Sequence, residues 1–597
     1  MKILRVIGRV ILYLLAGIGV VTAAFVIGVV TFTLTARDAP SPPDRMVLAI
    51  DLGRGIVERD RPDVFQTLTR TGPLVLRDTL EAIRAAATDE RVAGLVLDIG
   101  AAPVTLTDAQ AIRRAVAAFR ASGKFAHAFG ESYGGLGNGT VAYYLASAAE
   151  KVWMQPSGTL GIVGVAIEAP FISGTLEKLE VETRYEQRHE YKGAGEMFVR
   201  SGFSPEARES LEGVLDSWMA QIVAGIAEAR GLTPARIRGL IDEGPLLAKE
   251  AGDARLIDAL AYRDEFKAMI ADLAGSDAVW VTVERYTAIA PPVAGEGRKV
   301  ALIFGQGPIV PGRDSGSSVG RTRGFAADTV ADAILDAAKD SSVEAILLRI
   351  DSPGGAYGAS DTVWRAVQVA RELGKPVVAS LGRTAASGGY FVAMAADRIV
   401  AEAGTVTGSI GVLTVKFVTR GLWRKLGVEW DRVQAGRRAA IGSMIGDYPP
   451  GGAERVAAFL DAVYEDFTKK VADARDFDAG QIDRVARGRI WSGAAAKKVG
   501  LIDAIGGIEA GLDALRELLE LEPDAPLTIV ELPRPSRIEE MLATVRRQGF
   551  DIAVLSEIWN PGRLPLLPGP ITEIARQLDD IAPPVGILQM PHWRLAR

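Results

Sequence analysis

A single serine stands on a glycine-rich turn in the second half of the chain, within RTAASGGYFVAMAAD at residues 383–397. Gly388 and Gly389 follow Ser387, and the residues after them have the apolar pattern of a helix start. Backbone N–H groups at a helix start point toward any negative charge that develops in front of them. A serine hydroxyl, however, is a weak nucleophile until a neighbouring group accepts its proton. The turn therefore predicts acyl-transfer chemistry at Ser387 and requires a base from elsewhere in the chain.

A second pair of glycines, Gly354 and Gly355, lies in DSPGG at residues 351–355, directly after the apolar strand pattern AILLRI. Glycines at the end of a strand let the backbone approach a substrate closely, so their N–H groups are suitable oxyanion donors. Taken alone, each motif also fits an ordinary structural role, because Ser-Gly-Gly commonly caps a helix and Pro-Gly-Gly commonly forms a turn. The catalytic interpretation needs support from the rest of the chain.

The body of the chain contains the same pattern twice. RVAGLVLDIG at residues 91–100 recurs as SVEAILLRID at residues 342–351, and the segment from Tyr143 recurs from Tyr390, an offset of 390 − 143 = 247 residues. A period of this size indicates duplication of a whole domain. In both copies, short β-branched segments alternate with amphipathic patterns such as residues 79–89. This alternation predicts an α/β fold with parallel strands joined by helical crossovers.

We therefore expect two similar α/β halves, each with a long helical extension, at residues 205–230 and 451–475. These extensions are expected to pack on the sheets or to reach a neighbouring subunit. The expected units are a stub, apolar segment and linker (1–45), a first half (46–290), a second half (298–532) and a Pro-rich tail of unknown role (533–597).

Comparison of the two copies suggests where the base comes from. The offset carries Ser387 onto Thr140 (387 − 247 = 140), and it carries Lys192, in RHEYKGAGEMF, onto Ala439 (192 + 247 = 439). One half thus holds a candidate nucleophile and the other a candidate base, and each lacks what its sibling has. A lysine buried in an apolar pocket between two domains loses hydration of its charged form, so its pKa falls and the neutral amine can accept a proton.

Other interpretations of these residues remain open at this point. His189, three residues before Lys192, is a rival base that needs no shift of its pKa. Thr140 is a weaker candidate nucleophile, and a lysine on a polar stretch is usually solvated surface. The comparison of copies alone leaves a pairing of Ser387 with Lys192 as one hypothesis among these.

The N-terminal segment predicts a membrane anchor. Residues 10–34 carry no charge over 34 − 10 + 1 = 25 positions, and as a helix they would span roughly 37 Å, enough to cross a bilayer. Lys2, Arg5 and Arg9 precede the segment, so the positive-inside rule places the short N-terminus in the cytoplasm and the body outside. A cleaved signal peptide is the alternative, but its apolar region is usually shorter and followed by a small-residue cleavage site.

Composition excludes several classes of function. The 597 residues carry a net charge of −6 without long runs of one sign, so no basic surface indicates nucleic-acid binding. The absence of cysteine excludes disulfides and thiolate metal sites, and the three histidines lie far apart. We expect no metal ion and no other cofactor.

The combination of the N-terminal anchor, the duplication, DSPGG, the ASGGY turn, the following TGSIGV and the Tyr-Lys-Gly segment resembles the long form of bacterial signal peptide peptidase, the protease IV or SppA type. The resemblance covers about residues 1–530. It implies a Clp-protease/crotonase-like fold, here as tandem duplicated domains. It also implies a serine–lysine endopeptidase that degrades cleaved signal peptides and other short apolar or unfolded polypeptides.

Carried over residue by residue, the resemblance implies that Ser387 is the nucleophile and Lys192 the general base. Ser409 in TGSIG is similar to the serine that hydrogen-bonds the lysine, and Gly388 with the pair Gly354 and Gly355 would line the oxyanion hole.

The resemblance further implies a homotetramer in the bacterial inner membrane, anchored in lipid through its N-terminal helix, with the catalytic body on the periplasmic side. The Pro-rich tail and the AYGAS sequence after DSPGG depart from the pattern. Two other functions remain as alternatives, a catalytically silent membrane scaffold and a crotonase-like acyl-CoA enzyme.

Overall fold

The computed structural model describes residues 42–59, 72–100, 102–290, 297–314, 324–534, 587–589 and 594–595. The predicted membrane span at residues 10–34 lies outside these ranges. Within them, no helix is both long and apolar enough to cross a membrane.

The first half is built on a six-stranded sheet of order β11-β6-β5-β4-β1-β12, in which every neighbouring pair is parallel. Helices follow most strands, as the alternation in the sequence predicts. The strands are β1 (Met46–Asp51), β4 (Val92–Asp98), β5 (Phe125–Gly130), β6 (Lys151–Met154), β11 (Ala259–Leu260) and β12 (Val279–Thr282). The helices are α3 (Leu76–Thr88), α4 (Leu106–Ala121), α5 (Thr140–Ala146), α8 (Pro234–Glu243), α9 (Ala248–Asp253), α10 (Arg263–Ala274) and α11 (Val283–Ile289).

The second half repeats this order as β23-β19-β18-β16-β13-β24 with parallel pairs. Two further strands extend its sheet, β20 (Val406–Gly408), parallel to β18, and β22 (Ile490–Ser492), antiparallel to β20. The prediction of parallel strands with helical crossovers is therefore confirmed. The strands are β13 (Arg298–Gln306), β16 (Ala345–Ser352), β18 (Val377–Ala386), β19 (Arg398–Ala401), β23 (Ala504–Ile505) and β24 (Leu527–Leu532). The helices are α12 (Ala327–Lys339), α13 (Tyr357–Glu372), α14 (Gly388–Ala393), α15 (Arg420–Lys425), α16 (Gly452–Arg475), α17 (Ala479–Val485), α18 (Gly493–Lys498) and α19 (Ile508–Leu518).

Corresponding residues of the two halves make the same contacts. The Tyr143 hydroxyl donates to the Leu256 carbonyl at 2.6 Å, and the Tyr390 hydroxyl donates to the Leu501 carbonyl at 2.8 Å. These are the tyrosines that begin the matched segments in the sequence. The central strands are buried on both faces because helices cover both, so β16 reads AILLRIDS with six consecutive buried residues at its start, all apolar except Arg349.

A further six-stranded sheet joins the halves and has the order β15-β14-β17-β25-β21-β9. Its first-half strand β9 (Glu182–Gln187) pairs antiparallel with β21 (Leu413–Val418) of the second half over six register pairs. β25 (Ile587–Gln589), from the tail, lies between β17 (Gly354–Ala356) and β21. The remaining short elements are η1 (Leu52–Arg54), β2 (Ile56–Val57), β3 (Leu74–Val75), β7 (Thr159–Leu160), β8 (Ile167–Glu168), α6 (Ser173–Lys178), η2 (Gly193–Phe198), β10 (Leu246–Leu247), β14 (Ile309–Val310), β15 (Phe325–Ala326) and β26 (Arg594–Leu595).

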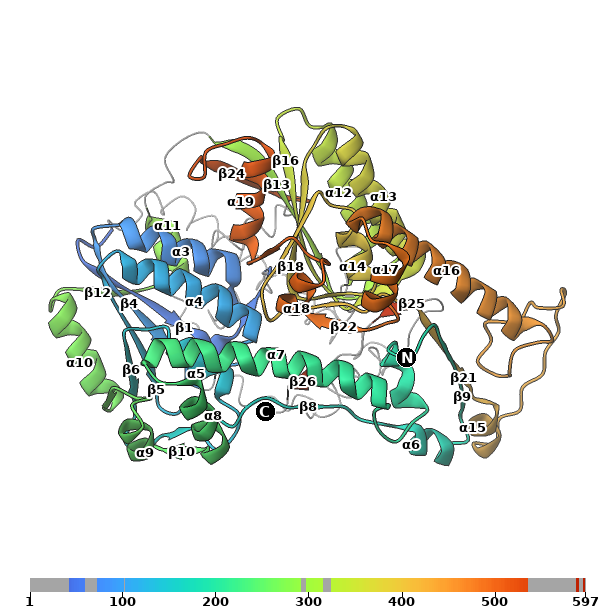
Figure 1. The fold of residues 1–597 in the computed structure, drawn as a ribbon, viewed down its shortest axis with the longest axis horizontal. Coiled ribbons are helices and arrows are strands. Elements are labelled where there is room, and N and C mark those ends of the chain that lie inside the picture. The colour runs from blue at the N-terminus through green and yellow to red at the C-terminus, as the bar shows by residue number, and fades with distance from the viewer. Residues whose placement is uncertain are drawn as a thin grey trace, which may run out of the picture.

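The 26-residue helix α7 (Pro205–Arg230) runs across both halves (Figure 1). Two residues explain where the helix begins and ends: Ser204 caps its N-terminus, and Gly231 takes a left-handed conformation after its C-terminus. At about 1.5 Å per residue it spans roughly 39 Å. The Trp218 indole N–H donates to the Gly404 carbonyl at 2.8 Å, and the Ser210 hydroxyl accepts from the Ile490 amide at 3.1 Å. The helix therefore fastens the first half to the second.

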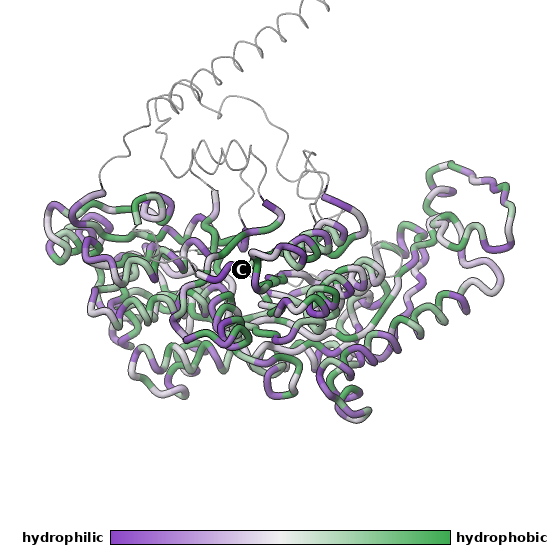
Figure 2. Tube along the Cα trace, turned by 90° about the horizontal axis from the view of Figure 1, so that it is seen from above, coloured by the Kyte–Doolittle hydropathy of each residue, from purple (hydrophilic) through white to green (hydrophobic). Residues whose placement is uncertain are grey.

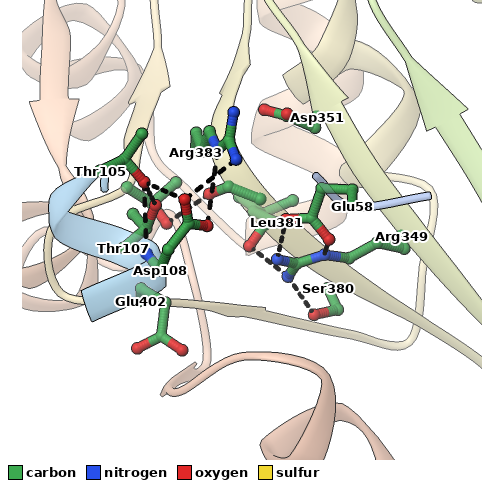
Figure 3. A network of polar contacts seen from close by, with 12 residues as sticks. Glu58, Thr105, Thr107, Asp108, Arg349, Asp351, Ser380, Leu381, Arg383 and Glu402 are labelled. Carbon is green, nitrogen blue, oxygen red and sulfur yellow. Dashed lines mark hydrogen bonds and ion pairs between the residues drawn. The ribbon is translucent and has the colours of Figure 1, made fainter. Parts of the chain in front are cut away.

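Two ion pairs, each with at least one buried partner, also cross between the halves (Figure 3). Arg349 on β16 forms two hydrogen bonds with Glu58, at 3.0 and 2.5 Å, and both side chains are 2% exposed or less. Arg383 on β18 forms an ion pair with Asp108 of α4 at 3.0 Å. Because the partners come from different halves, these charges fix the position of one half against the other.

The segment between α15 and α16 projects from one end of the molecule (Figures 1 and 2). It carries several large apolar side chains in solvent, of which Val433 is 99% exposed and Leu426 63% exposed. Trp430 and Met444 are about half exposed. Exposed apolar surface is typical of sites that contact another surface.

We expect Glu58→Ala to lower the melting temperature strongly, because it leaves the Arg349 guanidinium buried without its counter-ion. Breaking a buried pair in this way costs about 3–5 kcal/mol. Thermal unfolding of the purified protein measures the effect. Glu372→Ala, which removes the partner of Arg365 in a solvent-exposed pair, is the matched control and should change the melting temperature little. Equal shifts in the two variants would contradict this role of the Glu58–Arg349 pair.

Candidate active site

Ser387 lies between the end of β18 and the start of α14, at the centre of the second half. Its backbone has φ 56° and ψ −117°, a conformation that L-residues rarely adopt. Strain of this kind costs on the order of 1–3 kcal/mol and clusters at functional sites, as in the nucleophile elbows of α/β-hydrolases. The strained turn is held by hydrogen bonds, since the Ser387 amide donates to the Gly408 carbonyl at 2.8 Å and its carbonyl accepts from the Phe391 amide at 2.9 Å.

Lys192 reaches Ser387 from the first half. It stands five residues after β9, which pairs with β21 of the second half, and it immediately precedes η2. The Lys192 Nζ lies 2.7 Å from the Ser387 Oγ. Lys192 is 1% exposed and Ser387 is fully buried. The two residues that the comparison of the copies singled out, 195 positions apart in the chain, are therefore in direct contact.

Ser409 is the third member of this cluster. The Lys192 Nζ lies 2.9 Å from the Ser409 Oγ and 2.7 Å from the Ser409 carbonyl oxygen. Ser409 has a positive φ of 51°, and its amide donates to the Arg489 carbonyl at 2.8 Å. The irregular backbone after β20 thus directs both oxygens of Ser409 toward the amine.

Burial lowers the pKa of Lys192 well below its usual range. Within the described chain no carboxylate forms an ion pair with Lys192, so no nearby negative charge opposes the effect of lost hydration. A neutral amine has two N–H donors and one lone pair. The three contacts of the amine use all of these groups when its two N–H groups donate to the two Ser409 oxygens and its lone pair accepts from the Ser387 hydroxyl. Such an arrangement can remove the proton of Ser387.

The predicted oxyanion glycines lie beside Ser387. A Cβ on Gly388 would come within 3.0 Å of the Gly355 nitrogen and 3.3 Å of the Gly354 Cα, so the two glycine segments are in close contact. Gly388 begins α14, and its N–H is among those without an acceptor inside the helix. The Gly354 N–H donates to the Ser352 Oγ at 3.1 Å, and Gly354 has φ 106°. This leaves Gly388 and Gly355 as the better placed donors, with Gly354 shaping the turn.

The rival residues have other partners. The His189 ring packs against the Tyr464 ring with centroids 4.5 Å apart, while Lys192 is the side chain that contacts Ser387. The Thr140 Oγ1 accepts hydrogen bonds from the Val163 and Gly164 amides at 3.1 and 3.0 Å. The residue that corresponds to Ser387 in the first half therefore supports a loop.

Several residues that position Lys192 were missed by the sequence analysis. The Tyr185 hydroxyl donates to the Lys192 carbonyl at 2.7 Å. A Cβ on Gly488 would lie 2.4 Å from the Lys192 nitrogen, and one on Gly411 would lie 3.2 Å from its Cδ. Any side chain at Gly488 would displace the lysine backbone. The only signal in the sequence was the glycines themselves, whose contact with Lys192 depends on the pairing of distant segments.

β25 lies along the same site. Its register places Leu588 opposite Gly355 and Gln589 opposite Gly354, with Ile587 opposite both Ala356 and Leu413. An extended backbone thus fills the space between the glycine loop and the strand that follows Ser409.

In the described ranges, no group of three or more acidic, histidine or cysteine side chains is arranged to hold a metal ion.

The chain is similar to several known proteins. The sequence model of peptidase family S49 matches residues 131–277 and 369–522 of this chain. The chain is 34% identical over 465 residues to Protease 4 of Salmonella typhi, covering 75% of this chain and 72% of that protein. It is 32% identical over 459 residues to the chloroplastic serine protease SPPA of Arabidopsis thaliana, covering 76% and 67%. It is 27% identical over 463 residues to Protease 4 of Haemophilus influenzae, covering 75% and 73%.

The lowered pKa of Lys192 predicts how pH acts on stability. Between the folded-state pKa and the ordinary lysine value of 10.5, the unfolded chain binds one more proton than the folded chain, so this group makes stability rise with pH. Lys192→Met lacks the titrating amine. We therefore expect the melting temperature of the variant, relative to the wild type, to fall steadily as the pH is raised from neutral toward 10. A difference that is independent of pH would contradict a depressed pKa.

Proposed function

Because this chain belongs to peptidase family S49 and is a serine peptidase, we propose that it is a membrane-anchored endopeptidase that uses Ser387 as nucleophile and Lys192 as general base. The observation that carries the proposal is the 2.7 Å contact between the Lys192 Nζ and the Ser387 Oγ, in a buried site where the pKa of the lysine is lowered. Its substrates are cleaved signal peptides and other short apolar or unfolded polypeptides.

The first half of the reaction forms an acyl-enzyme. The Ser387 Oγ attacks the carbonyl carbon of the scissile peptide bond while its proton passes to the Lys192 Nζ. The carbonyl electron pair moves onto the oxygen, and the N–H groups of Gly388 and Gly355 stabilise the resulting oxyanion. The tetrahedral intermediate then collapses. The C–N bond breaks, and the Lys192 ammonium gives its proton to the departing amine.

The second half releases the product. A water molecule loses a proton to the neutral Lys192 amine and attacks the acyl carbon, and the second tetrahedral intermediate expels the Ser387 Oγ, which recovers the proton from Lys192. Ser409 holds the Lys192 amine in line with Ser387 throughout. Its hydroxyl and carbonyl oxygens also stabilise the ammonium that exists between proton transfers.

The pairing of β25 supports a substrate that binds as an extended strand. Main-chain pairing to a strand edge is a common mode of peptide recognition and needs no particular side chain. The substrate backbone takes the place of β25 between β17 and β21, which brings its carbonyl groups next to Gly355 and Gly388. Folded proteins cannot present such a strand, which restricts cleavage to short or unfolded chains.

Anchoring and location rest on the N-terminal sequence. We propose that residues 10–34 span the bacterial inner membrane once, with the N-terminus in the cytoplasm and the catalytic body in the periplasm. Proteolysis of intact cells with a permeabilised outer membrane tests this placement. The body should be digested from outside, whereas a protected body would overturn the topology.

We also propose that the chain assembles as a homotetramer. The exposed apolar side chains between α15 and α16, among them Val433 and Trp430, support contact with another copy. The chain belongs to a family of serine peptidases. This membership argues against the two alternative functions, a catalytically silent scaffold and an acyl-CoA enzyme.

Substitution of the two reacting residues tests the mechanism. With a fluorogenic peptide that contains a Leu-rich apolar stretch, Ser387→Ala and Lys192→Met should each lower kcat by at least about a thousandfold, because nucleophile and base act as a unit. Lys416→Met and Ser147→Ala are matched controls. Lys416 is also buried and bonded to carbonyl groups, and Ser147 is buried in the first half, but neither contacts Ser387. Full activity of Lys192→Met would overturn the proposed base.

The pH dependence of catalysis tests the protonation state of the base. Only neutral Lys192 accepts the serine proton, so kcat/KM should fall as the pH is lowered through its pKa. Because burial lowers that pKa, the fall should lie well below the range of an ordinary lysine. Measurement of kcat/KM from pH 6 to pH 11 checks this expectation; a rate still rising in proportion to hydroxide at pH 11 would contradict it.

The position of β25 predicts competition with substrate. Proline at both Leu588 and Gln589 removes the amide donors of this strand, and we expect the apparent KM to fall by about two- to tenfold at unchanged kcat. Leu595→Pro, in β26, which pairs with β8 away from the glycine loop, is the control. An unchanged KM in the double variant would show that β25 does not compete.

A further inference from the structure

The two central strands of the second half do not match residue for residue where they approach the active site. On β16, Ile350 pairs with Leu381 of β18, and the next recorded pair joins Ser352 to Ala385. One residue of β16, Asp351, therefore stands opposite three residues of β18, at positions 382–384. The extra residues form a bulge in the strand that carries Ser387 at its end. Bulges re-aim a strand and are frequent next to active sites.

The carboxylate of Asp351 fills this bulge. Its Oδ1 accepts a hydrogen bond from the Thr384 amide at 3.0 Å, on the side of β18 where the ladder with β16 is interrupted. Gly382 makes room for it, since a Cβ there would lie 2.8 Å from the Asp351 Cβ. The contact is thus close on both sides and determines the path of the chain over residues 382–384.

The first half lacks this side chain. The repeat aligns Gly100 with Asp351, and the ladder of β4 with β5, which runs from Gly94 with Phe125 to Asp98 with Phe129, ends before that position. Only the half that carries Ser387 therefore has a carboxylate at this point. This difference associates Asp351 with the reaction rather than with the fold that both halves share.

Asp351 connects the two loops that form the site. It is followed by Ser352, Pro353 and the glycine pair, and its hydrogen bond reaches Thr384, three residues before Ser387. Its main-chain carbonyl accepts from the Gly307 amide at 2.9 Å, which fixes the residue to β13 as well. One side chain thus ties the oxyanion loop to the nucleophile turn.

Charged groups from both halves surround this carboxylate (Figure 3). Arg383 lies beside it in the bulge and is held by Asp108, while Arg349, two residues earlier on β16, is held by Glu58. Burial and the charge of Glu58 raise the pKa of Asp351 to about 6. The cluster contains three carboxylates and two guanidinium groups. If position 351 is neutral, the charges of the two ion pairs, Arg383 with Asp108 and Arg349 with Glu58, balance each other.

We propose that Asp351 is a positioning residue for the proposed reaction, whose hydrogen bond to the Thr384 amide sets the distance between the nucleophile turn and the oxyanion loop. The inference rests on the assignment of Ser387 as nucleophile. Asp351 acts through a side-chain oxygen that accepts the hydrogen bond, and this does not require a negative charge on the side chain. Asparagine, which keeps the acceptor, can therefore replace aspartate, whereas alanine cannot.

Two variants and a control test the proposal. Misplacement by about 1 Å costs up to a hundredfold in rate, so Asp351→Ala should lower kcat by about ten- to a hundredfold with KM changed less than about twofold. Asp351→Asn should keep kcat within about threefold of the wild type. The matched control is Asp397→Ala, which removes a carboxylate that accepts from the Val377 amide at the opposite end of the same strand. It should lower the melting temperature without lowering kcat.

A measurement that does not depend on activity accompanies the kinetics. Hydrogen exchange of the segment around residues 383–388 should become at least about tenfold faster in Asp351→Ala and should stay near the wild-type rate in Asp351→Asn. Unchanged exchange and unchanged kcat in Asp351→Ala would overturn the proposal, as would an Asp351→Asn variant as impaired as the alanine one. Failure of the proposed function is distinguishable, because then the wild type itself shows no cleavage that depends on Ser387.

Discussion

The burial of one lysine amine without a counter-ion is the constraint on which the rest of this structure depends. Lys192 belongs to the first half of the chain, and the only described polar contacts of its amine are oxygens of Ser387 and Ser409 in the second half. Burial disfavours the charged amine, and in the described ranges no carboxylate pairs with it. A site of this kind exists only while the two halves remain in contact, so the fold must hold them together firmly.

Three kinds of contact between the halves meet that requirement. Strand β9 pairs with β21 and delivers Lys192, helix α7 lies across both halves, and the ion pairs of Arg349 and Arg383 fix the strands that lead to the active site. The duplicated sheets provide the same framework twice, but their equivalent turns differ. Ser387 is strained and bonded to Lys192, whereas Thr140 supports a loop. In the proposed mechanism, one copy thus carries the nucleophile and the other supplies the base.

Much of this arrangement follows from the sequence, because repeats and periodicity are local properties. The parallel strands and the helices of both halves were predictable. The first copy lacks a counterpart of Ser387 and the second lacks a counterpart of Lys192, which indicated a pair that the structure brings into contact. Pairings between distant segments were not predictable. The contact of Gly488 with Lys192, the bond from the Gly354 amide to Ser352, the bulge at Asp351 and the insertion of β25 all depend on register, which no periodicity encodes.

The most direct test of this account is an NMR titration of the Lys192 side chain in protein labelled with carbon-13 at the lysine Cε, with the Lys192→Met variant used to assign the resonance. The account predicts one lysine that titrates well below the ordinary value of 10.5 and whose signal is absent from the variant. A Lys192 resonance that titrates with the other lysines would contradict the account, because a charged amine cannot accept the proton of Ser387.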